Sequence, residues 1–286
     1  MLKTRVITAL VLLLAFLTAL FWLPPPAWAV FAGVLIVPAA WEWGKLIRLP
    51  QVACGLYVLI VAAACATLFG LAPAETADGP AVMQPGVAQS GGLQSAVFLG
   101  ASLFWTVVVP LWLWRSWLPQ ARWLAALTGL VVLVPAWLAL VELRKLGPFL
   151  LLLLLSVAWI SDSAAYFAGR RFGRHKLAPS ISPGKTWEGA GGAMLAVTLY
   201  AAIWGLAWQP YFPQVLKSMR FGTFGMLLFL CLLTAVGIYG DLFESALKRQ
   251  AGVKDSGALL PGHGGVLDRI DALTSVLPVA ALVYLA

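Results

Sequence analysis

Residues 147–167 read GPFLLLLLLSVAWISDSAAYF, an apolar run with a single charged residue, Asp162, near its end. The run has the length of about 20 residues that an α-helix needs to cross a bilayer. A charge at membrane depth is costly, so such residues usually face a bundle interior or a water-filled cavity. The run therefore predicts a membrane-spanning helix that leads into a polar site.

Apolar runs of this kind recur along the whole chain of 286 residues. Hydrophobic residues make up 62% of the sequence and charged residues 10%, and the mean hydropathy is +0.92. Soluble domains average about 45–50% apolar and about 25% charged residues, so a soluble, disordered or collagen-like protein is excluded. A transmembrane β-barrel is excluded as well, because its strands alternate apolar and polar residues. The runs that we expect to span the membrane are 6–23, 27–41, 51–72, 96–114, 123–141, 147–167, 189–208, 222–240 and 272–286.

The basic residues indicate how these helices are oriented. With a cytoplasmic N-terminus, 15 of the 19 Lys and Arg residues fall on the inner side, as the positive-inside rule requires. The net charge of +8 is therefore attributed to topology, and no nucleic-acid partner is expected. The run 6–23 resembles a signal peptide, but its length and the spans after it favour a first membrane helix. We expect an all-α, polytopic integral membrane protein of the bacterial inner membrane, with about nine transmembrane helices and a polar site facing the cytoplasm.

The acidic residues divide the chain into two regions. Seven of the eleven lie in the second half, and they are Asp162, Glu188, Asp241, Glu244, Asp255, Asp268 and Asp271. We therefore expect residues 1–146 to form a hydrophobic transmembrane scaffold and residues 147–286 to form a transmembrane catalytic region.

The first polar loop of the second half carries the stretch SPGKTWEG, residues 182–189. It follows a basic cluster, residues 169–176, which by itself indicates no more than attraction to anionic lipid. Gly184-Lys185-Thr186 resembles part of a phosphate-binding P-loop, but the first glycine of that motif is missing and no preceding β-strand is expected. A short turn that enters a helix still exposes free N–H groups, and Lys185 adds a positive charge. The loop therefore predicts contact with a phosphate group.

The second polar loop begins with Asp241, Glu244, Ser245 and Lys248, whose spacing by three and four predicts one face of a helix. An internally paired surface helix is the alternative interpretation. Farther along, His263 lies among glycines, where it acts either as a general acid or phosphate donor or as a backbone hydrogen-bonding group.

Asp268 and Asp271 follow, three residues apart, and with Asp241 they would make an oxygen-rich site of the kind that suits Mg²⁺. Carboxylates beside Lys and Arg are typical of a site for a polyanion with a bridging metal ion. The residues thus favour phosphoryl or nucleotidyl transfer at the membrane, with a lipid phosphate as second substrate.

Residues 245–271 read SALKRQAGVKDSGALLPGHGGVLDRID. This stretch resembles the signature of the phosphatidate cytidylyltransferase (CDP-diacylglycerol synthase) family, and residues 182–189 resemble a second segment of that family. The resemblance is strong over roughly the last 130 residues, whereas the first 140 match only as a hydrophobic scaffold. It implies that CTP and phosphatidic acid react to CDP-diacylglycerol and pyrophosphate. It also implies a dinuclear site at Asp241 and Asp268 that holds Mg²⁺ and, as a second ion, K⁺.

The two lines of reasoning yield one set of candidate residues. The candidate catalytic residues are Asp241, Asp268, Lys248, Arg249 and His263. The candidate substrate-binding residues are Asp162, Ser182, Lys185, Thr186, Glu188, Ser245, Lys254, Asp255 and Arg269. The candidate metal ligands are Asp241, Asp268 and Asp271.

Three other functions compete with this interpretation. A transporter would use Asp162 and Asp241 as ion-coupling residues, but the polar groups cluster on one side and no repeat pair is present. A CDP-alcohol phosphotransferase requires an Asp-rich pattern that this chain lacks. A CTP-dependent lipid kinase differs in its products, since it releases CDP instead of pyrophosphate. Beyond the substrates and the lipid bilayer, the sequence leaves a homodimer open.

Overall fold

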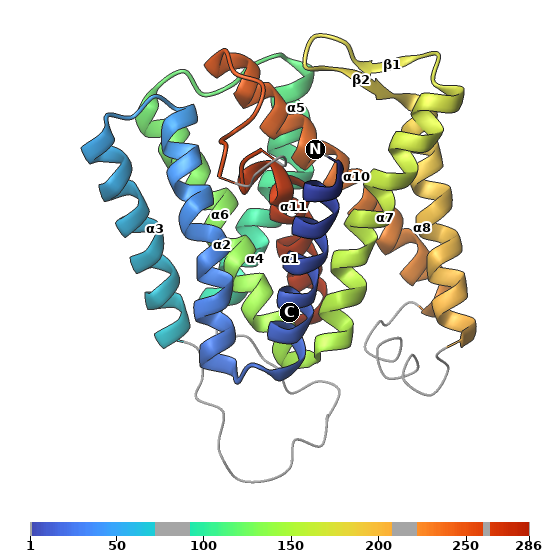
Figure 1. Ribbon diagram of the computed structural model, residues 1–286, viewed down its shortest axis with the longest axis horizontal. Coiled ribbons are helices and arrows are strands. Elements are labelled where there is room, and N and C mark those ends of the chain that lie inside the picture. Colours follow the sequence, from blue (N-terminus) through green and yellow to red (C-terminus); the bar gives the residue numbers. More distant parts are fainter. Residues whose placement is uncertain (1, 72–91, 208–221, 260–263, 286) are drawn as a thin grey trace, which may run out of the picture.

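The computed structural model describes residues 2–71, 92–207, 222–259 and 264–285. Each predicted apolar run lies on helix over its described residues except for single residues at the ends of three runs, and several helices extend beyond the predicted bounds (Figure 1). The helices are α1 (Leu2–Trp22), α2 (Pro25–Leu46), α3 (Gln51–Gly70), α4 (Gly92–Leu103), the π-helix η1 (Phe104–Val108), α5 (Val109–Trp114), α6 (Arg122–Leu146), α7 (Pro148–Phe172), α8 (Trp187–Ala207), α10 (Gly222–Ala251) and α11 (Leu267–Leu285). The predicted helical membrane architecture is confirmed.

Length and composition distinguish the helices that could cross a membrane from the others. Within the described part of the chain, six are long and apolar enough to cross a membrane: Pro25–Leu46, Gln51–Gly70, Gly92–Trp114, Arg122–Leu146, Pro148–Phe172 and Phe224–Ala251. The continuous helix Gly92–Trp114 combines α4, η1 and α5. The count of nine spans therefore stays a prediction.

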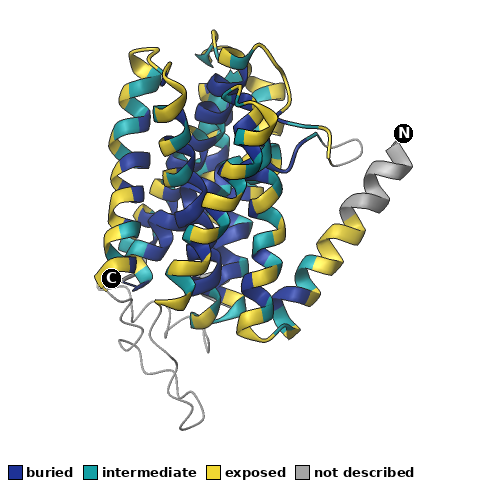
Figure 2. Ribbon diagram, turned by 90° about the vertical axis from the view of Figure 1, so that its left-hand side faces the viewer, coloured by how far each residue is buried: buried dark blue, intermediate teal, exposed yellow. Residues whose placement is uncertain are grey.

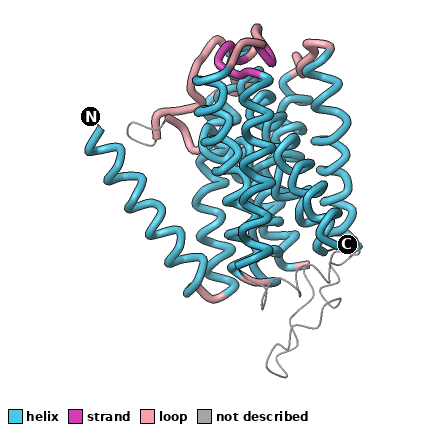
Figure 3. The backbone as a smooth tube through the Cα atoms, turned by 90° about the vertical axis from the view of Figure 1, so that its right-hand side faces the viewer, coloured by secondary structure: helices cyan, strands magenta, loops and turns pink. Residues whose placement is uncertain are grey.

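One local expectation was wrong, because a two-stranded antiparallel sheet precedes α8. Strand β1 (Lys176–Ala178) pairs with β2 (Ser182–Thr186), and Figure 3 shows this hairpin beyond the helix ends. Both strands are short and lie outside the apolar runs. They contain no alternation of apolar and polar residues from which strands could have been predicted. Strand β2 ends at Thr186 and α8 begins at the next residue, Trp187. The N–H of Trp187 donates to the carbonyl of His175 at 3.0 Å, which ties the start of α8 to the start of the hairpin.

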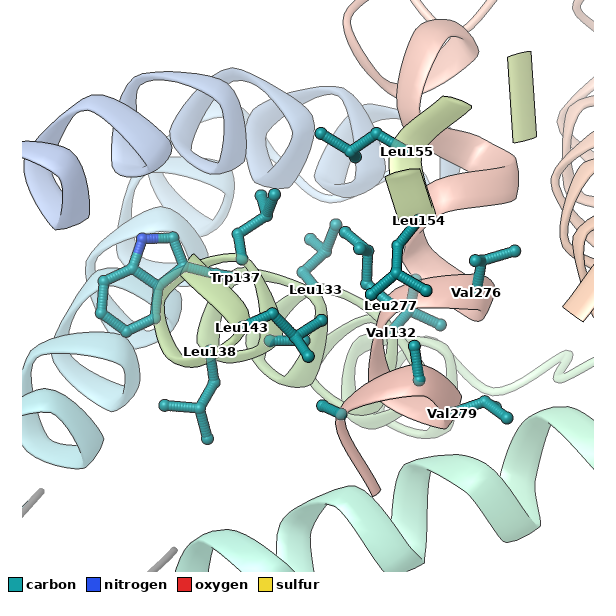
Figure 4. Close-up of a cluster of buried hydrophobic side chains, with 14 of the residues drawn as sticks. Val132, Leu133, Trp137, Leu138, Leu143, Leu154, Leu155, Val276, Leu277 and Val279 are labelled. Carbon is teal, nitrogen blue, oxygen red and sulfur yellow. The ribbon is translucent and has the colours of Figure 1, made fainter. Parts of the chain in front are cut away.

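The core of the bundle is formed by α6, α7 and α11. Figure 4 shows leucine and valine side chains of these helices meeting around Leu133, Leu154 and Leu277, each of which is no more than 1% exposed. Lipid tails are as apolar as leucine, so close van der Waals contact rather than removal from water holds membrane helices together. Figure 2 shows the buried residues concentrated inside the bundle, while α1 slants away from it.

Helices α7 and α8 approach each other through small residues. A Cβ atom on Gly192 would lie 2.4 Å from the Cβ of Ala168, and one on Gly189 would lie 2.9 Å from the carbonyl oxygen of Ala165. Glycine at such positions lets two backbones come into direct contact. This contact fixes the hairpin, which joins the two helices, relative to α7.

Helix direction alternates along the chain, so functional segments from distant parts of the sequence meet at one end of the bundle. The C-terminal ends of α2, α7 and α10, the hairpin and the N-terminal ends of α8 and α11 all lie at the upper end in Figure 1. We call this end, defined by those segments, the polar end.

Candidate active site

Four ionisable residues from four elements gather at the polar end, and we call them the outer cluster: Asp162, Lys185, Asp241 and Asp271. Lys185 of β2 reaches Asp241 of α10, with 2.6 Å between Nζ and Oδ2. Ser245, one turn along α10, donates its hydroxyl to Oδ1 of Asp241 at 3.2 Å. Asp162 of α7 and Asp271 of α11 are close enough to interact electrostatically with both Asp241 and Lys185. Three carboxyl groups from three helices thus lie near one ammonium group.

A second, more deeply buried group lies beside it, and we call it the inner cluster: Glu244, Lys248 and Asp268. The ammonium of Lys248 contacts the carboxylate of Glu244 one turn earlier on α10, and it lies 2.6 Å from Oδ1 of Asp268 on α11. The side chains of these three residues are only 4%, 11% and 6% exposed, in the order in which they are named. Asp268 also accepts two backbone N–H bonds at Oδ2, from Ser256 and Gly265, each at 2.9 Å.

The arrangement decides between the two interpretations of the second loop. The residues Asp241, Glu244, Ser245 and Lys248 do share one face of α10, as predicted. Glu244, Ser245 and Lys248 are buried, and the face meets partners from β2 and α11. The alternative of an internally paired surface helix is therefore wrong.

The hairpin residues differ in what they contact. Thr186 is buried, and its hydroxyl accepts the N–H of Gly189 at 3.1 Å, so it caps the first turn of α8. Glu188 precedes the apolar run 189–208 and contacts Nδ1 of His175 at 2.7 Å. Its own backbone N–H and the His175 side chain hold the pKa of Glu188 below its usual range, at about 2. Both residues fasten the hairpin to α8 and thereby set the position of Lys185.

The remaining predicted residues lie around these clusters. Arg249 is exposed and donates from Nε to the carbonyl of Ile181 at 3.3 Å, which joins α10 to the hairpin turn. Ser182 is half-buried at the start of β2, whereas Lys254, Asp255 and Arg269 are exposed at the polar end. His263 lies outside the described residues.

One buried acidic residue was missed by the sequence reasoning. Glu42 of α2 is 4% exposed and accepts hydrogen bonds from Ser256 in the second loop and from Val266 and Leu267, where the loop passes into α11. It belongs to the half that was expected to act only as scaffold. The signal that could have found it is the one that identified Asp162, a lone charge at the end of an apolar run.

Comparison with known proteins extends the resemblance to the whole chain. The cytidylyltransferase family matches residues 3–286. The chain belongs to this family. It is 38% identical over 296 residues to the phosphatidate cytidylyltransferase of Pseudomonas aeruginosa, covering 100% of this chain and 98% of that protein. The phosphatidate cytidylyltransferase of Haemophilus influenzae is 35% identical over 294 residues, covering 99% of each chain. The enzyme of that name from Thermotoga maritima is 45% identical over 141 residues, about half of each chain.

These matches confirm the predicted family and the assignment as a nucleotidyltransferase. They also reach beyond the motif-bearing last 130 residues and include the helix that carries Glu42.

Proposed function

We propose that this chain transfers the CMP moiety of CTP to phosphatidic acid, releasing pyrophosphate and forming CDP-diacylglycerol. The observation that carries the proposal is the pair of clusters at the polar end, where Lys185 and Lys248 lie among carboxylates contributed by α7, α10 and α11. Full-length relatives named phosphatidate cytidylyltransferase supply the identity of both substrates.

The reaction asks for positioning and charge neutralisation rather than for a covalent catalyst. An oxygen of the lipid phosphate bonds to the α-phosphorus of CTP, and the bond from that phosphorus to the β-phosphate oxygen breaks. A phosphate monoester has a second pKa of about 6, so its attacking oxygen is already anionic near neutral pH and needs no general base. The protein's part is to hold two polyanions together and to offset the charge of the leaving pyrophosphate.

The three basic residues of the site differ in exposure, and this difference indicates which phosphate each could contact. The Lys185 side chain is 23% exposed and can exchange its contact with Asp241 for a nucleotide phosphate that enters from solvent. Lys248 is held between two carboxylates, so it presents a fixed positive charge deeper in the site. Arg249, exposed beside the hairpin turn, suits a phosphate at the rim, since its guanidinium group binds phosphate in a forked geometry.

The outer cluster also has the donors that Mg²⁺ prefers. The carboxyl oxygens of Asp162, Asp241 and Asp271 lie near a single lysine, and carboxylate oxygens are ligands that Mg²⁺ binds. As the residues stand, no three metal-ligating side chains in the described part of the chain are arranged to hold a metal ion. We propose that Asp241 and Asp271 hold Mg²⁺ once Lys185 has moved to the nucleotide. When bound, the ion would neutralise phosphate oxygens.

Asp268, also predicted as a ligand, is occupied by Lys248 and two backbone N–H groups. It would join the metal site, with K⁺ as the second ion, only if Lys248 released it. We propose further that the polar end faces the cytoplasm of the inner membrane, because CTP is a cytoplasmic nucleotide and the basic residues concentrate on this side.

The test is a pyrophosphate-release assay on detergent-purified protein with CTP, phosphatidic acid and Mg²⁺. Release should require all three components, and CDP-diacylglycerol should appear in step with pyrophosphate. ATP in place of CTP should give no release. Pyrophosphate-free turnover that yields CDP and a phosphorylated lipid would instead identify a lipid kinase, and no turnover from folded protein would refute the proposed substrates.

A further inference from the structure

The carboxylate of Glu42 lies at the centre of contacts between α2 and the second loop. Its Oε1 accepts the N–H of Val266 at 3.1 Å, and its Oε2 accepts the N–H of Leu267 at 2.8 Å. The hydroxyl of Ser256 also donates to Oε2, at 3.1 Å. Ser256 belongs to the first described part of the loop, residues 252–259, Val266 ends the second, residues 264–266, and Leu267 begins α11, so a single side chain joins both ends of the loop.

The surroundings of Glu42 are built to fit a carboxylate. A Cβ atom on Gly257 would lie 2.3 Å from Oε1, and one on Gly265 would lie 2.6 Å from Oε2. Among the described residues, Glu42 forms no ion pair, so its charge is balanced by N–H groups where α11 begins. Negative charge at the N-terminus of a helix is favourable because the backbone N–H groups there point outward.

The same backbone carries the contact onward to the inner cluster. Ser256 gives its hydroxyl to Glu42 and its N–H to Oδ2 of Asp268. Gly265, which packs against Glu42, gives its N–H to the same oxygen of Asp268. The other oxygen of Asp268 contacts Lys248. A continuous chain of contacts therefore runs from Glu42 through the loop to Asp268 and Lys248.

A second contact from the same end of α2 also holds the second loop in place. Arg48, just beyond α2, donates from Nη2 to the carbonyl of Ala251 at 3.2 Å, where α10 ends and the loop begins. The N-terminal half thus holds the loop at the end of α10, at Ser256 and at the start of α11.

We infer that Glu42 is a positioning residue for the active site, which fixes the loop so that Ser256 and Gly265 orient Asp268 toward Lys248. The inference rests on the proposed function for its catalytic readout. It assigns a role in the site to the half of the chain that the sequence presents as scaffold. Because Glu42 supports the inner cluster and not the Lys185–Asp241 pair, its loss should reduce kcat more than it raises KM for CTP.

Glu42→Gln is the test, with Glu142→Gln as the matched control. Glu142 is also a buried carboxylate, 6% exposed, but it contacts Gln94 and Lys145, where α6 ends away from the polar end. Glu42→Gln should lower kcat by about tenfold or more, as expected when a buried charged acceptor is lost, whereas KM for CTP stays within about twofold. Glu142→Gln should leave kcat within about twofold of wild type.

Amide hydrogen exchange measured by mass spectrometry without substrates provides the second readout. In Glu42→Gln, exchange should accelerate at Val266 and Leu267 and also in the peptide that contains Ser256, whose N–H bonds to Asp268 and not to Glu42. Acceleration confined to Val266 and Leu267, with unchanged kcat, would show that Glu42 only caps α11 and would overturn the inference. An equal loss of kcat in Glu142→Gln would overturn it as well.

A double-mutant cycle of Glu42→Ala and Gly257→Ala tests whether the two residues act through the same contact. The methyl group added at position 257 would displace the Glu42 carboxylate, so Gly257→Ala alone should lower kcat in the same way as Glu42→Ala. If both act through one contact, the double variant should be no worse than the poorer single variant, while additive losses would contradict the inference. If wild-type protein does not use CTP, the proposed function fails, and the exchange measurement still decides whether Glu42 holds Asp268 in place.

Discussion

Substitution of Lys248 by methionine should destabilise the protein strongly, and the structure indicates why. Among the described residues, Lys248 is the one positively charged partner of the inner cluster, and it contacts both Glu244 and Asp268. With both carboxyl groups ionised, the three residues sum to a charge of −1, and without Lys248 the remaining two sum to −2. Breaking a buried ion pair by removing one partner costs about 3–5 kcal/mol, because the other charge stays buried without compensation.

Loss of Lys248 should destabilise the buried carboxylate of Glu244 more than that of Asp268. Asp268 keeps two backbone N–H bonds, whereas neither oxygen of Glu244 has a well-formed hydrogen bond among the described residues. Most of the penalty should therefore come from Glu244. The double variant Glu244→Gln/Lys248→Met returns the group to −1, and it should recover roughly 0.5–3 kcal/mol of the loss, the range of coupling between residues in contact.

Thermal unfolding in detergent, followed through the fluorescence of the 14 tryptophans, measures the effect. Lys248→Met should lower the apparent Tm by roughly 6–10 °C, given about 2 °C per kcal/mol for a chain of this size. Lys45→Met is the control, because Lys45 is exposed and its ammonium lies 5.5 Å from the ring of Trp41, a contact worth less than about 1 kcal/mol. Equal shifts for Lys248→Met and Lys45→Met, or no recovery in the double variant, would refute the reasoning.

Three further predictions concern activity and pH. Asp241→Asn and Asp268→Asn should each abolish pyrophosphate release while the protein elutes from a sizing column as wild type does; wild-type activity in either variant would contradict the proposed metal and charge roles. Lys185→Ala should chiefly raise KM for CTP, by about tenfold or more if a charged phosphate contact is lost, and an unchanged dependence of rate on CTP would count against that role. Because the pKa of Glu188 is lowered in the folded state from 4.5 to about 2, its stabilising contribution is complete above the unfolded value and disappears as the pH falls toward the folded one. The difference in Tm between wild type and Glu188→Gln should thus shrink as the pH falls below about 4.5, and a difference that persists unchanged to about pH 2 would contradict the lowered pKa of Glu188.

Most of the helices could be predicted from the sequence, because a membrane-spanning helix is recognised from the length and hydropathy of a local run of residues. The run around Asp162 illustrates this, since both the helix and its charged end were evident from the residues alone. The shared face of Asp241, Glu244, Ser245 and Lys248 was likewise predictable, because a helical period is a local property. The motif then identified the family, which full-length relatives confirm.

What the sequence did not reveal depends on contacts between distant segments. The pairing of Glu42 with Ser256 joins residues 214 positions apart, and no local pattern encodes it. The separation of Asp241 and Asp268 into two clusters has the same origin, since Lys185 comes from the hairpin and Lys248 from α10. The hairpin itself consists of strands of three and five residues, which are too short for a periodic signal.

The most direct test of the central claim is the fate of isotopic label from CTP. Purified protein would receive phosphatidic acid, Mg²⁺ and CTP labelled at either the α- or the γ-phosphate, and the lipid and aqueous phases would be counted separately. Nucleotidyl transfer at the polar end predicts α-label in the lipid and γ-label in aqueous pyrophosphate, with both signals absent in Asp241→Asn. Recovery of γ-label in the lipid, or undiminished α-label transfer by Asp241→Asn, would contradict the account.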